Sequence, residues 1–174
     1  MKDLKPDSIY VGLEHLPVKS IALQNWDIAE NINSDKLLFR QGEILFCKIR
    51  PYLHKVALAS VNGSCSSDTI IIKATESRFL PYVLQIAFCD TFIDHATITS
   101  KGTKMPRADW SVLKKFPIFK PTDELLDNFN KISSPILEQI NSLSESNRHL
   151  IKTRNLLLPR LISGKLSVKQ SYGE

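Results

Sequence analysis

Residues 122–162 read TDELLDNFNKISSPILEQINSLSESNRHLIKTRNLLLPRLI, and this stretch decides how the chain is organised. Thr122 is a good N-cap, and the two acidic residues after it suit the positive end of a helix dipole. The stretch holds no glycine, and its only prolines are Pro135 and Pro159. It therefore predicts one long helix from about residue 123 to residue 158, with a kink near Pro135.

An apolar seam runs along this predicted helix. Its positions are separated by steps of three or four residues, with one extra step of four near Pro135, which is typical of a coiled coil containing a stutter. About 35 helical residues span ~50 Å, whereas a domain of about 120 residues has a radius of gyration near ~14 Å. Such a domain is too small to cover the seam, so we expect a second helix to do so. The alternative is a solvated helix docked on its own domain.

Two positions of the seam, Asn147 and Arg154, are polar. Polar interruptions of this kind fix the register and orientation of paired helices at some cost in stability. The predicted seam comprises Leu125, Phe129, Ile132, Ile136, Ile140, Leu143, Asn147, Leu150, Arg154 and Leu157.

The first 120 residues show a different pattern, in which short runs of β-branched and aromatic residues alternate with turns. We predict four strands, and the Asn62-Gly63 turn signal before the last of them predicts an antiparallel meander. Residues 79–92 place apolar side chains at helical spacing and predict one helix packed on the sheet, while residues 112–119 suit a short strand or one helical turn. The predicted strands cover residues 8–13, 43–49, 56–61 and 69–73.

Length and composition agree with one domain and an appendage. The 174 residues are 43% hydrophobic and 24% charged, which is ordinary for a folded protein. No apolar run approaches the roughly 18 residues of a membrane span, and no signal-peptide core follows Met1, so we expect a cytoplasmic protein. The three cysteines are predicted to be reduced and mostly buried. The expected fold class is α+β: a small mixed or antiparallel β-rich domain over residues 1–120, a long helix over 121–162 and a tail over 163–174.

The net charge is +5, and the cations gather in two stretches. Residues 101–120 hold six basic residues and one acid, and residues 40–55 hold four basic residues and one acid. A local excess of this kind suits a polyanionic partner, although solvated loops around a fold would give the same counts.

No catalytic constellation is present in the sequence. The four histidines are scattered, and none has a partner at metal-ligand spacing. Neither a nucleotide-binding glycine motif nor a methyltransferase or nuclease motif is found. We therefore expect that the chain is not an enzyme and binds no metal or cofactor of its own.

Four segments of the chain are distinctive in their amino-acid sequence and in their order. They are YVGLEHL at residues 10–16, GEILFCKIRPYLHK at 42–55, GTKMPR at 102–107 and LLPRLISGKL at 157–166. Together they resemble the specificity subunit of type I restriction-modification systems, and the last segment is the most specific of the four.

This resemblance implies a protein that selects a DNA sequence for a separate methyltransferase subunit and a separate endonuclease subunit, which also translocates DNA. Such specificity subunits carry two target recognition domains, each followed by a long helix, and the two helices run side by side in opposite directions. This chain looks like one half of that plan, with an N-terminal part of the usual domain expected to be absent. Such a half-subunit would restore the arrangement of the full-length subunit by pairing its long helix with that of a second copy of the chain. S-adenosylmethionine, ATP and Mg²⁺ are then expected only on the partner subunits.

Two loops are predicted to contact double-stranded DNA. Cations at the ends of the loop at residues 48–55 can follow a phosphate backbone, while an aromatic ring and an imidazole between them face base edges. In the second loop, Gly102 allows the backbone to approach a phosphate closely. The alternative is a pair of loops whose cations are simply solvated, and the turn at residues 64–68 is a weaker candidate. The predicted DNA-binding residues are Lys48, Arg50, Tyr52, His54, Lys55, Lys101, Gly102, Thr103, Lys104 and Arg107.

Two other functions fit the same pattern. The chain could be the recognition module of a fused restriction-methylation enzyme, separated from its catalytic polypeptide. It could also be an assembly adaptor whose basic loops contact protein instead of DNA.

Overall fold

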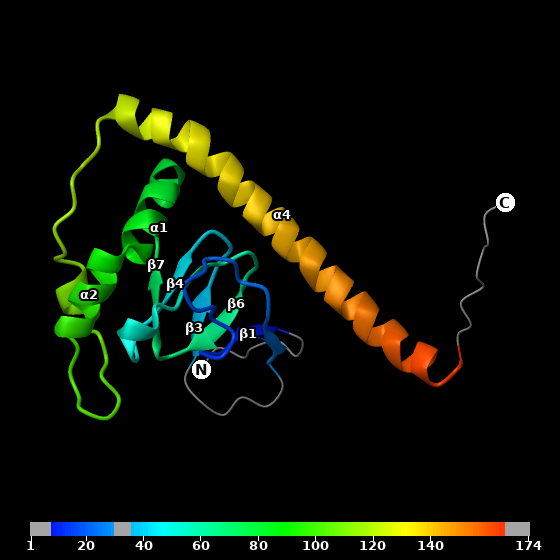
Figure 1. Cartoon of the computed structure of the whole chain (residues 1–174). Coiled ribbons are helices and arrows are strands. Elements are labelled where there is room, and N and C mark those ends of the chain that lie inside the picture. The colour runs from blue at the N-terminus through cyan, green and yellow to red at the C-terminus, as the bar shows by residue number, and fades with distance from the viewer. Residues whose placement is uncertain (1–7, 30–35, 166–174) are drawn as a thin grey trace.

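The computed structural model describes residues 8–29 and 36–165 of the chain. A small β-rich domain carries two short helices at one end, and one long helix passes along the domain and continues well beyond it (Figure 1). The strands are β1 (Ile9–Val11), β2 (Asp27–Ile28), β3 (Lys36–Phe39), β4 (Ile44–Cys47), β5 (Val56–Leu58), β6 (Gly63–Ser66) and β7 (Thr69–Ile72). The helices are α1 (Leu80–Phe88), α2 (Asp90–Ile98), α3 (Trp110–Leu113) and α4 (Asp123–Ile162), with short 3-10 turns η1 (Pro51–Leu53) and η2 (Ser77–Phe79). Most of the predicted tail, from residue 166 onward, lies outside the described residues.

The strands form two sheets, with orders β2-β1-β6-β3 and β5-β4-β7. The predicted meander is therefore wrong: β4 pairs antiparallel with both β5 and β7, and β6, between them in sequence, joins the other sheet. The reason lies at Gly63, where a Cβ would stand 2.8 Å from the carbonyl oxygen of Ile9 and 2.9 Å from the ring of Phe39. The glycine allows β6 to approach β1 and β3 closely instead of making a tight reversal.

Strand β4 lies at the centre of the core and is buried along its whole length. Ile44 and Phe46 belong to the cluster that includes α1 and α2, and the Phe46 ring meets the Phe92 ring edge-on with centroids 5.6 Å apart. Leu45 and Cys47 belong to a second cluster with residues of β1, β3 and β6. Because successive residues of a strand point to opposite faces, burial of both faces explains the continuous apolar run ILFC.

The single helix predicted over residues 79–92 is two helices in the structure. The backbone is extended at Cys89 (φ −71°, ψ 147°), which ends α1 and caps α2. This break changes the direction of the chain, so that Leu84 of α1 and Phe92 of α2 both reach the same core cluster. Where a short strand or one helical turn was predicted over residues 112–119, the structure has the one-turn helix α3 over Trp110–Leu113, which overlaps only the start of that region. The Ser111 amide donates to the Asp109 carboxylate at 2.8 Å at the start of this helix.

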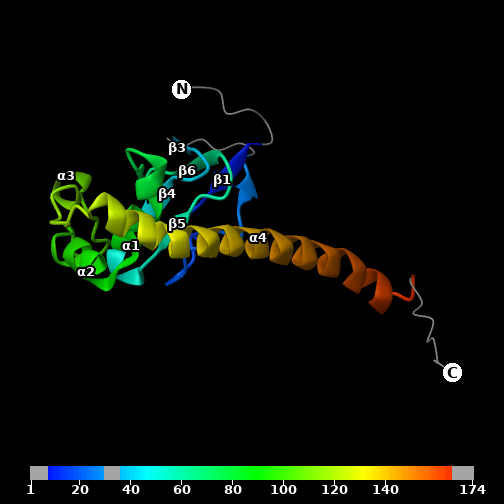
Figure 2. The same cartoon turned by 90° about the horizontal axis from the view of Figure 1, so that it is seen from above.

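Helix α4 contains 40 residues, which corresponds to a length of ~60 Å. The Thr122 hydroxyl accepts a hydrogen bond from the amide of Leu125, as predicted for the N-cap. The helix continues through Pro135 and Pro159, and both views show a gently curved rod without the expected sharp kink (Figure 1, Figure 2). Each of the two prolines removes one backbone donor from the helix.

All three cysteines are free thiols, as predicted, and Cys47 and Cys65 are buried. Burial raises the pKa of the Cys65 thiol to about 11. In the described parts of the chain, no helix has the length and apolar character needed to cross a membrane.

Candidate nucleic-acid interface

The structure brings together parts of the two loops predicted to contact DNA. Residues 101–107 form a small hairpin in which Lys101 and Arg107 exchange backbone hydrogen bonds of 3.0 and 2.9 Å. The outer arm of this hairpin pairs with residues 48–50: the Arg50 amide donates to the Pro106 carbonyl at 2.8 Å, and the Ala108 amide donates to the Lys48 carbonyl at 2.8 Å. Two basic segments that are some fifty residues apart in sequence therefore share one rigid backbone framework.

Asp68 links the side chains of the two segments. The Arg107 guanidinium donates to both carboxylate oxygens, from Nε to Oδ1 at 2.9 Å and from Nη2 to Oδ2 at 3.3 Å. The Lys48 ammonium lies 3.7 Å from Oδ1 on the same carboxylate. These interactions, chiefly the hydrogen bonds from Arg107, lower the pKa of Asp68 below its ordinary value, so the group is a carboxylate at neutral pH. The turn at residues 64–68 thus joins the two loops through its last residue.

The tip of the hairpin is the most exposed part of this framework. Gly102 has φ +104°, and a Cβ there would stand 3.3 Å from the Met105 carbonyl oxygen, so the turn needs a glycine. Lys101, Thr103 and Lys104 are all exposed around it. The eight ion pairs within the described residues include neither lysine. The tip therefore offers two ammonium groups and a hydroxyl to solvent.

The loop at residues 50–55 is divided between exposed and buried positions. Arg50 and Tyr52 are exposed. His54 is only 5% exposed, and its Nε2 lies 2.7 Å from the Phe88 carbonyl oxygen. The prediction that the His54 ring faces base edges is therefore wrong. The ring instead holds η1 against the junction of α1 and α2. The half-buried Lys55 donates to the Leu13 carbonyl at 2.7 Å, which directs its ammonium toward the turn that follows β1.

Helix α4 docks on its own domain through a face that is distinct from the predicted seam. Leu126 is buried, Asn130 donates to the Arg78 carbonyl at 2.8 Å, and the Arg148 guanidinium lies 4.2 Å from the centre of the Trp26 ring. These contacts recur at steps of three or four residues along the helix, through Leu126, Asn130, Ser134, Leu137, Asn141, Ser144 and Arg148. This stripe is rotated by about 100° from the seam, since each residue advances that far around an α-helix.

The seam itself is left uncovered by the domain. Its apolar side chains are exposed by between 36% at Phe129 and 69% at Ile132, and Ile140, at the boundary with the docked stripe, is half-buried. Beyond Arg148, every described residue of α4 is exposed. The alternative of a helix docked on its own domain is thus correct for the first two-thirds of α4, but it concerns a different face. Sequence reasoning missed this second stripe because most of its residues are polar.

The basic framework and α4 occupy different parts of the molecule. In Figure 1 the loop that leaves the end of α2 projects to the lower left, while α4 runs along the upper right of the domain.

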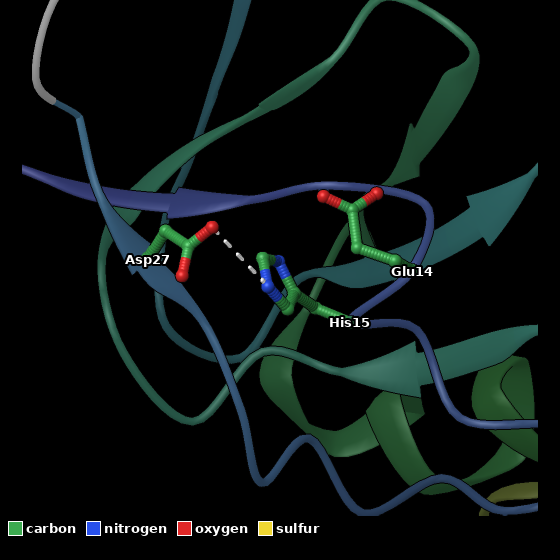
Figure 3. Close-up of side chains that lie close together, drawn as sticks. All are labelled: Glu14, His15 and Asp27. Carbon is green, nitrogen blue, oxygen red and sulfur yellow. Dashed lines mark ion pairs between the residues drawn. The ribbon is translucent and has the colours of Figure 1, made fainter.

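Among residues 8–29 and 36–165, one group brings three potential metal ligands together, namely Glu14, His15 and Asp27 (Figure 3). The His15 Nδ1 accepts a hydrogen bond from the Gly12 amide at 2.9 Å, and Nε2 faces the Asp27 carboxylate at 3.6 Å. In a neutral ring whose Nδ1 accepts, Nε2 carries the proton and has no lone pair for a metal. His15 thus links the YVGLEHL turn to β2.

Comparison with known proteins finds that the chain is similar to members of the family that the four segments resemble. It is 25% identical over 175 aligned residues to the type I restriction enzyme EcoDI specificity subunit of Escherichia coli, an alignment that covers 94% of this chain and 38% of the relative. It is 22% identical over 171 residues to the type I restriction enzyme MjaIX specificity subunit of Methanocaldococcus jannaschii, covering 92% of this chain and 38% of the relative. The chain thus spans well under half the length of these curated relatives. No family model matches it.

Solved structures share the fold. A chain from a study of complex assembly and conformational transition in a type I restriction-modification system superposes with a TM-score of 0.61 at 17% identity. The HsdS subunit from Thermoanaerobacter tengcongensis superposes with a TM-score of 0.59 at 16% identity. Each match covers 96% of this chain and 45% of the other. The predicted resemblance and the predicted α+β fold with a long C-terminal helix are confirmed.

Proposed function

We propose that this chain is a recognition half of a type I restriction-modification specificity subunit, which directs methyltransferase and endonuclease subunits to a bipartite DNA target. The observation that carries this proposal is the convergence of both basic loops on one hydrogen-bonded framework, away from a helix whose apolar seam stays exposed. A protein of this design can hold DNA and a protein partner at the same time. The sequence relatives support it, because each is named a type I specificity subunit.

DNA binding follows from the chemistry of the framework. Lys101, Lys104 and the hairpin-tip amides are suited to phosphate oxygens, whereas the planar groups of Arg50, Tyr52 and Arg107 are suited to base edges or to packing on sugars. His54 and Lys55 no longer belong to this surface, because their polar atoms bind backbone carbonyls inside the domain.

The exposed seam is proposed as the contact for a second copy of α4. The two helices would run antiparallel about a two-fold axis, which places one recognition domain at each end. The DNA target would then be an inverted repeat of two half-sites, with the helix length of ~60 Å as the upper scale of their separation. Methyltransferase subunits would bind the assembled pair, and the endonuclease subunit would join through the complex.

Catalysis is assigned to those partner subunits. In this proposal the chain works in the cytoplasm, uses no cofactor itself, and relies on S-adenosylmethionine, ATP and Mg²⁺ held by its partners. The purified chain should transfer no methyl group from labelled S-adenosylmethionine to DNA, and transfer should begin when a methyltransferase subunit is added. Methyl transfer that follows the isolated chain through two different chromatographic columns would contradict this assignment.

DNA binding can be tested by fluorescence anisotropy with labelled duplex DNA over a range of salt concentrations. Replacement of Lys101 and Lys104 by alanine should weaken binding, and the slope of log K against log salt should become shallower by about 0.9 for each phosphate that the variant no longer neutralises. Lys152→Ala is the matched control, since it removes a cation from α4 and should leave the slope unchanged. Absence of binding by the wild-type chain, with and without a methyltransferase subunit, would instead favour the assembly adaptor.

A further inference from the structure

We propose that Arg107 reads a guanine in the DNA target and that Asp68 is the positioning residue that aims it. This inference rests on the proposed function, and it deepens it by naming the base and the side chain that would recognise it. Three features of the framework carry it: the edge of the guanidinium that Asp68 occupies, the anchoring of the Arg107 backbone, and the presence of an acid on a basic surface.

The Asp68 carboxylate occupies only one edge of the Arg107 guanidinium. Nε and Nη2 each donate one hydrogen bond to it, at 2.9 and 3.3 Å. A guanidinium carries five N–H groups, so both N–H groups of Nη1 and the second one of Nη2 remain. The outward pair from Nη1 and Nη2 is the fork that fits O6 and N7 of guanine in the major groove. The Arg107 side chain is 48% exposed, so this fork can be reached from solvent.

The backbone of Arg107 is held from both sides. Its amide and carbonyl bond to Lys101 across the hairpin, at 2.9 and 3.0 Å, and it pairs with Ile49 as an antiparallel bridge on its other side. Both the base of this side chain and its head group are thus fixed before DNA arrives. Preorganisation of this kind reduces the conformational entropy cost of binding and sets one direction of approach, which is what discrimination between bases requires.

The presence of Asp68 on this surface also needs a reason. A carboxylate near the phosphates of DNA weakens binding to every sequence alike. Asp68 sits between Lys48 and Arg107, and it reduces the charge that both offer to a phosphate. The weaker attraction to phosphates is explained if the carboxylate orients a side chain that reads a base. The exposed Lys101 and Lys104 at the hairpin tip would then supply the contacts that do not depend on sequence.

The test is selection of duplexes from a random library by the purified chain, with methyltransferase subunit present, followed by sequencing. Arg107→Lys keeps the charge but removes the fork, and Asp68→Asn keeps the size but removes the bidentate acceptor. Both should reduce the preference for guanine at the same single position of the consensus, by roughly 5- to 150-fold, which corresponds to ~1–3 kcal/mol for a bidentate pair. Preferences at the other positions should be retained, which also shows that the domain is folded.

Two control variants separate this role from a structural one. Lys48→Ala removes the other partner of Asp68, and Lys104→Ala removes a tip cation; both should weaken binding and leave the consensus unchanged. A consensus that survives Arg107→Lys and Asp68→Asn would overturn the inference while leaving the proposed function intact. Equal weakening at all positions by these variants would make the pair a phosphate contact and would also overturn it. A wild-type chain that selects no consensus would refute the proposed function itself.

Discussion

Substitution of Leu150 by alanine should weaken the association of two copies of the chain. Leu150 lies on the seam of α4, two residues beyond the last contact of the helix with its own domain at Arg148. Its side chain is 66% exposed, so only a partner can bury the remainder. Alanine preserves helix propensity, and the variant therefore perturbs the seam without breaking the helix.

The size of the effect follows from this exposure. Complete burial of a leucine side chain contributes about 1.5–3 kcal/mol, and Leu150 still has 66% of its surface to bury. Each copy therefore contributes about 1–2 kcal/mol at this position. A two-fold dimer contains the position twice, so the substitution should cost about 2–4 kcal/mol and raise the Kd by roughly 30- to 700-fold.

Leu156→Ala is the matched control. Leu156 is 58% exposed on the same helix, and it lies about 120° around the axis from Leu150, away from the seam. It should leave the Kd unchanged. At the other extreme, aspartate at both Leu143 and Leu150 would bury unpaired carboxylates in the interface at several kcal/mol per site, which should abolish the dimer.

Sedimentation equilibrium over a wide dilution series gives the Kd of each variant. A wild-type chain that stays monomeric at its highest soluble concentration would refute self-pairing and leave the seam to the methyltransferase subunit. Equal weakening by Leu150→Ala and Leu156→Ala would show that the interface is not the seam. A dimer that persists in the double aspartate variant would place the contact outside α4.

Three further predictions concern the domain itself. Leu126→Ala, at a position only 1% exposed where α4 docks on its own domain, should lower the free energy of unfolding by about 2–5 kcal/mol in a denaturant titration and leave the dimer Kd unaltered below the transition. His54→Ala removes the contact to the Phe88 carbonyl and should destabilise the fold by about 1–3 kcal/mol; a shallower salt slope for DNA binding in this variant would return His54 to the interface. The pKa of Cys65, raised to about 11 by burial, should keep its thiol unreactive toward alkylating reagents at neutral pH until the protein is unfolded, as mass spectrometry of the alkylated peptides would show.

Local pattern was enough to predict the elements whose signal repeats along the chain. The long helix of the structure, Asp123–Ile162, begins at the predicted N-cap, because capping and a three-and-four-residue repeat are properties of neighbouring residues. The four segments that suggested the family are likewise continuous stretches, and the relatives confirm that resemblance. The apolar run Ile44–Cys47 was identified as a strand for the same reason.

Which of these segments contact one another was decided by the tertiary structure. Gly63 was interpreted as a turn residue, although it serves the close approach of β6 to two strands far away in sequence. The residue type of His54 suggested a binding role, yet the carbonyl that its ring contacts belongs to a helix 34 positions later in the sequence. Nothing local to Asp68 indicates that Lys48 and Arg107 converge on it.

The sequence by itself therefore determined the long helix, its apolar seam, the basic segments and the family resemblance. Strand order, the face by which α4 docks, and the joining of two basic loops into one surface were decided only by tertiary contacts. The physical reason is that helical periodicity and capping act within a few residues, whereas strand pairing and burial depend on groups that the chain brings together from distant positions. Helix α4 illustrates both the local pattern and the tertiary contacts. Its apolar seam was evident in the sequence, whereas its more polar docked face was evident only from the contacts with the domain in the structure.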